Sequence, residues 1–345
     1  MQESPLASQT KNAVEQYIAA LMAKRQNEAS AIHPRYELLW ENIKKISTDG
    51  GKRLRPYLTM VGYGEFSNLV IPIASAQELI HIAMLIHDDI IDQDNVRHGS
   101  KNISGIYDNE YSQYLNKKQS AHYASSSALV AGDALIAEAH LSIAVSSFDQ
   151  NTVRQLTERL HQSVFEVVGG ELLDVEAAFM RFDLDPQIIC RYKTAGYSFI
   201  GPLLSGAICQ KADEWTKKSL EQYGLNAGIA FQLQDDLLGM FGDEKKIGKS
   251  KLTDLHEAKY TLLIAEHRRM MSGAMKQRFS KNFASDSATL EDLLQLKHDI
   301  KVSGARDKIE GIIKIHVDNA LRAIQSVNQS TELENFTKAM MNRYL

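Results

Sequence analysis

The sequence predicts an all-α protein, and three observations carry that prediction. The 345 residues include only six prolines, and long stretches place apolar residues three and four positions apart. No run alternates between apolar and polar residues in the way that a half-buried strand requires. A hydrophobic content of 44% and a charged content of 24% are ordinary for a globular chain that buries a sizeable core.

The predicted helices follow one another with polar turns between them. Residues 11–47 give one or two amphipathic helices, and residues 74–92 give an apolar helix that is buried on most sides. Further helices are predicted at 124–147, 151–180, 187–210 and 217–240, with several more at 256–345. The clearest breaks are "FDLDPQ" and "FGDEKKIGKSKLTD". Because no repeat, low-complexity tract or linker marks a boundary, we expect a single domain over residues 1–345, one large helical bundle.

Composition excludes several classes of protein. The net charge is −4, from 39 basic and 43 acidic residues, so nothing favours a nucleic-acid partner, which would select a strongly basic face. Only Cys190 and Cys209 occur, which excludes a disulfide scaffold and fits a reducing compartment. The first residues are polar, and no apolar run reaches the roughly 18 residues that span a bilayer. We therefore expect a cytoplasmic protein without stable membrane insertion.

The stretch "LIHDDIIDQDNVRHGS", residues 85–100, places several aspartates after an apolar run. On a helix, Asp88 and Asp92 share a face, and Asp89 lies beside them. A solvated acidic face is the ordinary explanation for such a cluster, but the preceding turns are too apolar for a solvated helix. Carboxylates at the end of a buried helix need a partner, and Mg²⁺ commonly takes one or two carboxylates and completes its shell with phosphate and water. Arg97 and His98 would add positive charge for the same anion.

A second acidic cluster repeats this arrangement far away in the sequence. Asp235 and Asp236 end an apolar helix, Asp243 follows, and a series of lysines comes after it. Two such pairs, each followed by basic residues, predict a metal–diphosphate site between two facing helices, which is where helical bundles build such sites. Lys245 and Lys246 are better explained as part of a charged surface loop.

A third piece is "GGKRLRP", residues 50–56, where glycines precede Lys52, Arg53 and Arg55. It lacks the Walker pattern and is not a P-loop. From its residues alone, a cationic phosphate-binding hook and a basic surface turn both remain open.

These pieces together resemble the trans-isoprenyl diphosphate synthase family, also called polyprenyl synthetases. The resemblance also rests on "GELLD" (170–174), "YKTAG" (192–196), "FQLQDDLLGMFGD" and "GK…DL…K" (248–259), in the family's order over most of the chain. It is closest to the geranylgeranyl and polyprenyl diphosphate synthases. The resemblance implies an all-α bundle of the isoprenoid synthase type with a central active-site cavity. It also implies a homodimer.

The resemblance assigns roles residue by residue. It implies that Asp88, Asp92 and Asp235 hold three Mg²⁺ ions, which clamp the diphosphate of an allylic substrate, with Asp89 and Asp236 in support. The implied contacts to that diphosphate come from Arg97, Lys193, Lys249 and Lys259, and we expect His98, which departs from the family pattern, to donate a hydrogen bond to phosphate. The positions that match those holding isopentenyl diphosphate are Lys52, Arg55 and His81. Thr194 and Gln232 match positions facing the developing carbocation, where their dipoles stabilise positive charge, and Phe231 would pack near the prenyl chain.

Two positions depart from the family pattern. The second acidic motif usually ends in Asp, but this chain has Gly239 there, and we assign no metal to it. The first motif is usually followed by two arginines, and here the second is His98, which is mostly neutral near pH 7.

A ladder of residues one helical turn apart leads away from the first acidic cluster. Ile80, Met84 and Asp88 are four apart, and Ala83 is a neighbour on the same side. If the prenyl tail runs down this face, the small Ala83 allows a long product, whereas Ile80 and the flexible Met84 limit it to about twenty carbons. The alternative is that these are ordinary core residues.

Other classes fit less well. A catalytically weak subunit of a heteromeric synthase would lose the aspartate motifs, and a longer-chain polyprenyl synthase would need a deeper tunnel. A terpene cyclase would lack the hook of Lys52 and Arg55. A metal-dependent phosphohydrolase with an "HD" motif would leave the second acidic cluster unexplained.

Overall fold

The computed structural model describes residues 4–48, 50–97, 99–180, 184–242, 255, 259–285 and 287–342. The chain forms two compact units, Met1–His161 with Gly201–Ala212, and Gln162–Ile200 with Asp213–Leu345. The expectation of a single domain stays a prediction.

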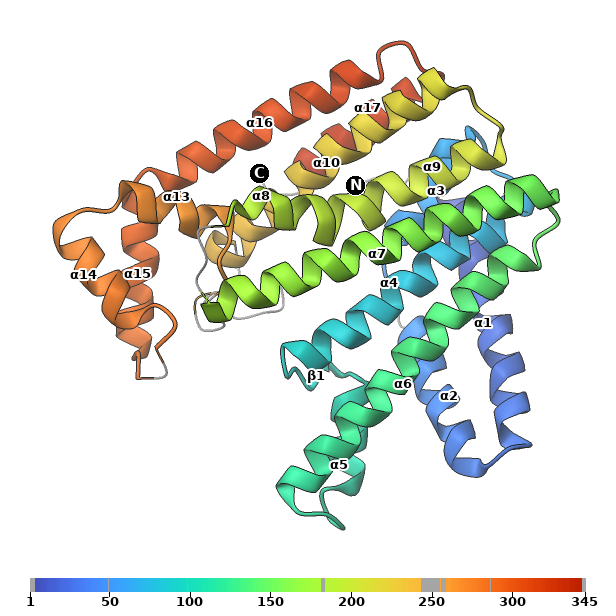
Figure 1. Ribbon diagram of the computed structural model, residues 1–345, viewed down its shortest axis with the longest axis horizontal. Helices are drawn as coiled ribbons and strands as arrows, with labels where there is room; N and C mark the ends of the chain where they lie inside the picture. The colour runs from blue at the N-terminus through green and yellow to red at the C-terminus, as the bar shows by residue number, and fades with distance from the viewer. Residues whose placement is uncertain are drawn as a thin grey trace. The chain divides into compact units, whose positions relative to one another are not determined.

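The first unit is a set of packed helices with one short hairpin (Figure 1). α4 lies alongside α6, and α3 lies alongside α9. The elements are α1 (Pro5–Ser30), α2 (Pro34–Thr48), α3 (Leu54–Tyr63), the 3₁₀ turn η1 (Asn68–Val70), α4 (Ile71–Ile91), β1 (Val96–Arg97), β2 (Ser100–Lys101), α5 (Ile103–Tyr111), α6 (Lys117–Ala144), the start of α7 (Gln150–Met180) and α9 (Gly201–Cys209).

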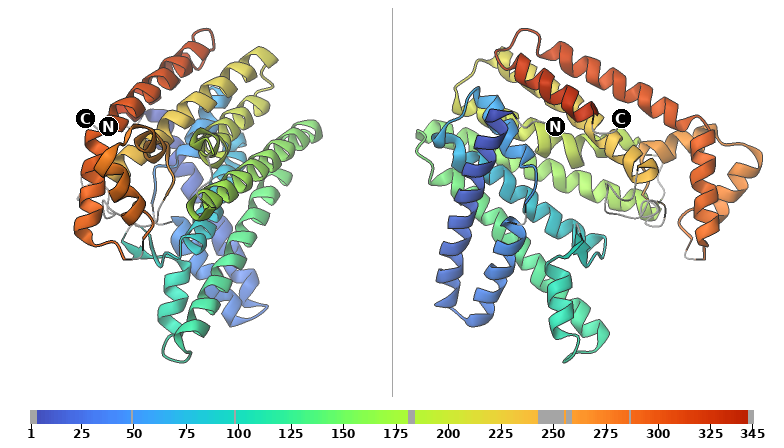
Figure 2. Two further views of the ribbon diagram at one scale, coloured as in Figure 1. Left: turned by 60° about the vertical axis from the view of Figure 1, so that its left-hand side comes forward. Right: turned by 180° about the vertical axis from the view of Figure 1, so that it is seen from behind.

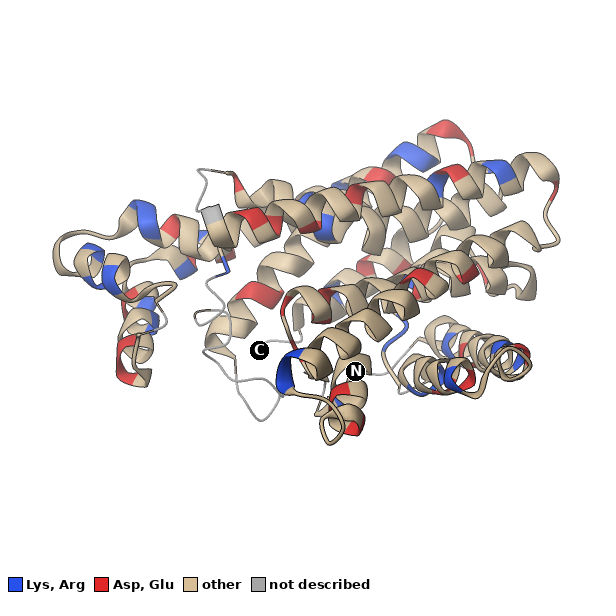
Figure 3. Ribbon diagram, turned by 60° about the horizontal axis from the view of Figure 1, so that its bottom comes forward, with Lys and Arg blue, Asp and Glu red and all other residues tan. Residues whose placement is uncertain are grey.

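The second unit contains the rest of α7 and the C-terminal helices. α10 packs along both η2 and α16, as the views in Figure 2 agree. The remaining elements are α8 (Pro186–Ile189), the π-helix η2 (Cys190–Ile200), α10 (Glu214–Phe241), α13 (Leu262–Met270), α14 (Gly273–Asn282), α15 (Leu290–Val302), α16 (Ala305–Ala323) and α17 (Ser330–Met341). In both units acidic and basic residues are interspersed along most helices (Figure 3).

α4 is the core helix of the first unit, as its apolar sequence predicts. Pro72 stands in its first turn, where a missing backbone N–H is tolerated. Ile73, Leu79 and Ile80 are at most 1% exposed, and burying a side chain of this size contributes about 1.5–3 kcal/mol. By length and composition alone, the stretches Asn68–Ile91 and Lys117–Ala144 could each cross a membrane, but 72% of the apolar window of the first is buried inside the protein.

The structure differs from the predicted elements in three places. The predicted helix 187–210 is α8, η2 and α9 in succession, with a π-helix over "CRYKTAGYSFI". The two-residue strands β1 and β2 pair antiparallel where no strand was predicted. α3 begins inside "GGKRLRP", at Leu54, and was not predicted as a helix.

Candidate active site

The first acidic cluster lies at the C-terminal end of α4. Asp88 and Asp89 stand in its last turn, and Asp92 caps the helix. Gln93 takes a left-handed conformation (φ 58°), and the amide of Asp94 donates to the carbonyl oxygen of Asp89 at 2.8 Å. This is the backbone turn of a Schellman motif, which satisfies the last carbonyl groups of the helix. It reverses the chain, so that the residues after it return toward α4.

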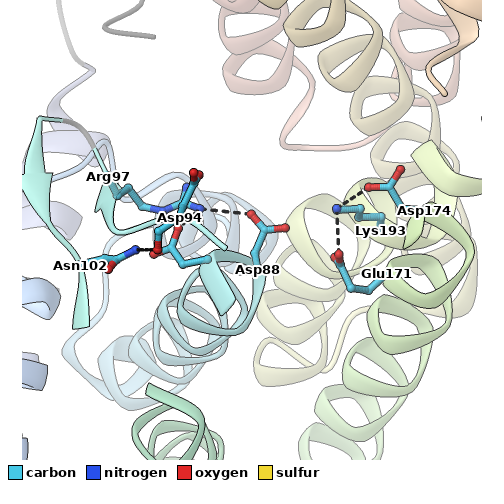
Figure 4. A network of polar contacts seen from close by, with 8 residues as sticks. Asp88, Asp94, Arg97, Asn102, Glu171, Asp174 and Lys193 are labelled. Carbon is cyan, nitrogen blue, oxygen red and sulfur yellow. Dashed lines mark hydrogen bonds and ion pairs between the residues drawn. The ribbon is translucent and has the colours of Figure 1, made fainter. Parts of the chain in front are cut away.

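Arg97 of β1 is the cation of this cluster. Its Nε donates to Oδ1 of Asp89 at 2.8 Å, and its Nη2 lies 3.1 Å from Oδ2 of Asp88 (Figure 4). Asp89 is only 4% exposed, and burial raises its pKa, an effect that Arg97 offsets only in part. Burial alone would lower the pKa of Arg97, but Asp89 and Asp88 hold it above the ordinary value. Arg97 therefore stays charged, Asp89 faces it, and the more accessible carboxylates are those of Asp88 and Asp92.

Asn102 fixes the hairpin that carries Arg97. Its Oδ1 accepts a hydrogen bond from the amide of Gly105 at 2.8 Å and so caps α5. Its Nδ2 donates to the carbonyl oxygen of Asp94 at 2.6 Å (Figure 4). Asn102 is 5% exposed. The loop is therefore tied at both ends, by the Schellman turn and by the cap of α5. Asn102 was not among the predicted site residues, although its position before a helix is a capping signal.

The second acidic cluster lies on the last turns of α10 in the second unit. Asp235 and Asp236 are both half-buried. The hydroxyl of Thr194 donates to Oε1 of Gln232 at 2.6 Å, and Nε2 of Gln232 donates to Oδ1 of Asp236 at 2.8 Å. This chain of hydrogen bonds joins η2 to α10. It also orients the Gln232 amide and leaves the lone pairs of the Thr194 oxygen as its remaining acceptors.

Lys193, next to Thr194 on η2, contacts two carboxylates of α7. Its Nζ lies 3.1 Å from Oε1 of Glu171 and 2.6 Å from Oδ2 of Asp174 (Figure 4). All three side chains are between 21% and 24% exposed. A Cβ on Gly170 would lie 2.2 Å from the Lys193 backbone nitrogen, so only glycine allows α7 and η2 to approach this closely. The motif "GELLD" was part of the family resemblance, but no role was predicted for its residues. In the structure Gly170, Glu171 and Asp174 all lie beside Lys193.

The "GGKRLRP" loop has two accessible cations rather than three. Lys52 is exposed and Arg55 is half-buried, but Arg53 is 5% exposed. Arg53 donates to Oε1 of Glu78 at 2.9 Å and to the Ser47 carbonyl oxygen at 2.8 Å. The interpretation of all three basic residues as one cationic hook is wrong for Arg53, because two buried contacts and a nearby carboxylate occupy its guanidinium.

The predicted chain-length residues lie on α4 one and two turns before Asp88. Ile80 is 1% exposed and Ala83 is fully buried, whereas Met84 is half-buried, as is His81. Phe231, on α10, packs its ring 5.5 Å from that of Phe199. Burial of these side chains fits both a tunnel wall and ordinary core packing.

Several predicted residues lie outside the described part of the chain. These are His98, Lys249, Asp243, Lys245 and Lys246. Lys259 is described and half-buried, shortly before α13, and Gly239 is half-buried on α10. The other predicted site residues fall into two groups, those on the first unit (Lys52, Arg55, Ile80, His81, Ala83, Met84, Asp88, Asp92, Arg97) and those on the second (Lys193, Thr194, Phe231, Gln232, Asp235, Lys259). A site between two facing helices stays a prediction.

The carboxylates suit a hard divalent cation in kind and number. Within the described ranges, no three His, Cys, Asp or Glu side chains are arranged to hold a metal ion. Asp88 and Asp92 are half-buried and one turn apart, and Mg²⁺ commonly binds through one or two carboxylates with phosphate and water completing its shell. These residues therefore fit Mg²⁺ bound together with a phosphate-bearing substrate better than a metal held by protein ligands alone.

Known proteins resemble this chain in both sequence and fold. A model of the polyprenyl synthetase family matches residues 36–300. The chain belongs to the polyprenyl synthetase family. It is 32% identical over 309 residues to a geranylfarnesyl diphosphate synthase of Aeropyrum pernix, covering 83% of this chain and 88% of that one. It is 29% identical over 317 residues to a geranylgeranyl diphosphate synthase of Saccharolobus solfataricus, covering 86% and 90%.

A solved structure confirms the fold. The geranylgeranyl pyrophosphate synthase from Corynebacterium glutamicum, complexed with isoprenyl diphosphate and magnesium, has a TM-score of 0.90 and covers 98% of this chain and 99% of its own. At 23% identity this likeness shows the fold alone. The predicted all-α fold of the isoprenoid synthase type is thus confirmed, and so is the predicted class of enzyme, an isoprenyl diphosphate synthase, which is a prenyltransferase.

Proposed function

We propose that this polyprenyl synthetase joins isopentenyl diphosphate to an allylic diphosphate, head-to-tail and in trans, with geranylgeranyl diphosphate as product. The observation that carries the proposal is the end of α4, where Asp88 in the last turn and Asp92 at the C-cap terminate a buried apolar helix. A substrate that is charged at one end and apolar at the other matches this arrangement.

Mg²⁺ is the metal that the carboxylates favour. Asp88, Asp92 and Asp235 would hold it, with three ions present when the allylic diphosphate is bound. Bound Mg²⁺ acts as a Lewis acid and offsets the charge that builds up on the leaving diphosphate. The donor set of carboxylate oxygens supports this assignment, as does the magnesium in the Corynebacterium glutamicum structure.

Basic side chains bind the allylic diphosphate. Arg97 is held in place by Asp89, and a substrate phosphate would share its guanidinium with Asp88. Lys193 would leave Glu171 and Asp174 for the diphosphate, since a doubly charged anion competes well for an ammonium group. Lys249, Lys259 and, more weakly, His98 complete the set.

The condensation then proceeds through an allylic cation. The C–O bond of the allylic diphosphate breaks, and the diphosphate leaves with the electron pair. The double bond of isopentenyl diphosphate, held by Lys52, Arg55 and His81, attacks the cation. Thr194 and Gln232 turn their oxygen dipoles toward the positive charge, an arrangement that their mutual hydrogen bond supports. The proton lost from the new product passes to the departing diphosphate.

Ala83, Ile80 and Met84 set the product length. The small side chain of Ala83, about one turn before the aspartates, would allow the prenyl tail to pass beside α4, with Phe231 packing near that tail. Relatives that are named geranylgeranyl diphosphate synthase support geranylgeranyl diphosphate as the product. A longer product is the second candidate, favoured by the small size of Ala83 and by the 32% identity to a geranylfarnesyl diphosphate synthase.

The active form would be a cytoplasmic homodimer. α7 exposes a row of large apolar side chains at helical spacing, and α6 exposes another. The row on α7 consists of Phe165 (68% exposed), Val168 (55%), Leu172 (62%) and Phe179 (80%). A second copy of the chain that buries these rows would remove apolar surface from water.

The test is a condensation assay with purified chain, Mg²⁺, labelled isopentenyl diphosphate and farnesyl diphosphate, followed by chromatography of the dephosphorylated product. A single geranylgeranyl product is expected. Ala83→Phe should shorten the product because the ring fills the space beside α4, and an unchanged length would refute the tunnel-wall role. Longer products would favour the second candidate. No product from the unmodified chain would refute the proposed function and favour a weak subunit of a heteromeric synthase.

A further inference from the structure

Arg53 stands between two residues of the proposed isopentenyl diphosphate site, yet it points away from solvent. Its side chain is 4% exposed, whereas the residue before it, Lys52, is exposed. The Arg53 backbone is left-handed, with φ 48° and ψ 47°, at the start of α3. A long side chain rarely adopts this conformation, and it persists only where surrounding contacts fix it.

Three helices of the first unit supply those contacts. Nη1 donates to Oε1 of Glu78 on α4 at 2.9 Å, and Nη2 donates to the carbonyl oxygen of Ser47 on α2 at 2.8 Å. Nε lies 3.4 Å from Oε1 of Glu15 on α1. Glu78 is itself 4% exposed. The hydrogen bonds to Glu78 and Ser47 fix the buried guanidinium, and Glu15 adds an ion pair without a hydrogen bond at Nε. Removing Glu78 would leave a buried charge unpaired.

The anchor determines where the loop lies. Gly50 and Gly51 also have positive φ values, 86° and 115°, so the backbone of this loop is neither helix nor strand. A Cβ on Gly51 would lie 3.7 Å from Nη1 of Arg53, so the guanidinium lies next to Gly51. Glu78 lies three residues before His81, so the two share a face of α4. The Arg53–Glu78 pair therefore ties the loop to the same helix face that carries His81.

We propose that Arg53 is a positioning residue for isopentenyl diphosphate. It does not touch the substrate, and it sets the places of Lys52 and Arg55 relative to His81. Lysine cannot replace it, because one ammonium group cannot reach three partners in the fixed fork of a guanidinium. The inference rests on the proposed function, since it assigns a site to one of the two proposed substrates.

The test uses the full chain and the variants Arg53→Lys and Arg53→Met. We expect the KM for isopentenyl diphosphate to rise by about tenfold or more, because a shift of about 1 Å in a binding group costs that much. The KM for the allylic diphosphate should stay within about twofold, since its proposed ligands lie elsewhere. Arg25→Lys is the matched control. Arg25 is also ion-paired, to Glu138 at 2.6 Å, but sits outside the loop, so its variant should change stability without this split in KM.

Amide hydrogen exchange of residues 50–56, without substrate, decides the structural half of the inference. Exchange in this segment should rise in Arg53→Lys and stay unchanged in Arg25→Lys. Equal losses for both substrates, or unchanged exchange in the loop, would overturn the inference. Failure of the unmodified chain to condense the substrates would refute the proposed function instead, and the exchange experiment would still decide whether Arg53 orders the loop.

Discussion

Each unit has a pair of an arginine and a buried aspartate, and the pKa of the aspartate is raised in the first pair and lowered in the second. In the first unit, Arg97 bonds to the buried Asp89, and burial raises the pKa of that carboxyl group. In the second unit, Arg278 grips Asp299 through Nε at 2.7 Å and Nη2 at 2.8 Å, and these hydrogen bonds lower the pKa of Asp299. The geometries differ as well, because Arg278 contacts both oxygens of Asp299, whereas Arg97 contacts one oxygen of Asp89 and one of Asp88.

The surroundings separate them. Arg278 is 37% exposed and forms its ion pair with Asp299. Gln295 donates a further hydrogen bond to Asp299 at 3.1 Å. Arg97 is 21% exposed and is shared with a second carboxylate, that of Asp88. The pair on α14 and α15 is satisfied within itself, whereas the pair at the end of α4 lies in an excess of negative charge. A partly buried cluster with more carboxylates than cations is a place where a positively charged ligand, such as a metal ion, is expected to bind.

The largest difference between the two clusters should appear when one carboxylate of each is replaced by an amide. Asp88→Asn should lower kcat/KM by about 10³-fold or more with little change in Tm, because a metal ligand acts on the transition state. Asp299→Asn should do the reverse, lowering Tm by about 5 °C through the lost ion-paired hydrogen bonds while activity stays near normal. Steady-state kinetics and thermal unfolding of both variants test this. Similar behaviour of the two variants would contradict the division into site and structural pairs.

The arginines give the next effect. Arg97→Lys should lower kcat/KM by about 10²-fold, since lysine cannot serve Asp89, Asp88 and a phosphate together. Arg278→Lys should change kcat/KM by less than about twofold, because among the described residues that pair interacts with Gln295 on α15 and His267 on α13 and with none of the proposed site residues. The same kinetic assay compares them. A loss of activity in Arg278→Lys as large as in Arg97→Lys would mean that the C-terminal helices influence the chemistry.

A hydroxyl pair inside the second unit gives a smaller contrast. Thr194 donates to Gln232 at 2.6 Å, and Thr337 lies 2.8 Å from the hydroxyl of Tyr223. Thr194→Val should lower kcat by about 10-fold to 10²-fold with little change in KM, as expected for a dipole that acts only on the cationic transition state. Thr337→Val should lower Tm and leave kcat unchanged. Single-turnover rates at saturating substrate measure the difference, and an unchanged rate in Thr194→Val would remove Thr194 from the proposed mechanism.

The sequence predicted the elements that carry strong apolar periodicity, and it missed those that depend on packing. α4 and α10 lie where they were predicted because their apolar residues repeat at helical spacing. The π-helix η2 was predicted as ordinary helix, since its hydrogen-bond register depends on neighbours such as Gly170, which lets α7 approach the backbone of Lys193. π-helices inside helical segments are frequent at functional sites, but no residue pattern in "YKTAG" predicts one.

The same limit applies to the site. The basic residues of "GGKRLRP" left a cationic hook and a surface turn both open, and nothing in the local sequence predicts that Glu15 and Glu78 contact Arg53 from two other helices. The aspartates could be predicted because their number beside an apolar run is unusual. The partners of Arg53 and Lys193 could not, because ordinary glutamates and aspartates supply them from distant parts of the sequence.

The smallest expected effect is the pH dependence of stability, and it should differ in sign between the two pairs. The folded pKa of Asp299 is below its ordinary value of 3.8, so the stability it contributes is present above that pH and is lost as the pH falls through the folded pKa. Acid unfolding below about pH 4 should therefore be less steep in Asp299→Asn than in the unmodified chain. Asp89, whose folded pKa is raised, contributes no such loss on acidification. Urea unfolding at several acid pH values, with chelator present, measures the pH dependence of the free energy of unfolding for Asp299→Asn and Asp89→Asn. If that dependence is also shallower in Asp89→Asn than in the unmodified chain, burial does not dominate the pKa of Asp89.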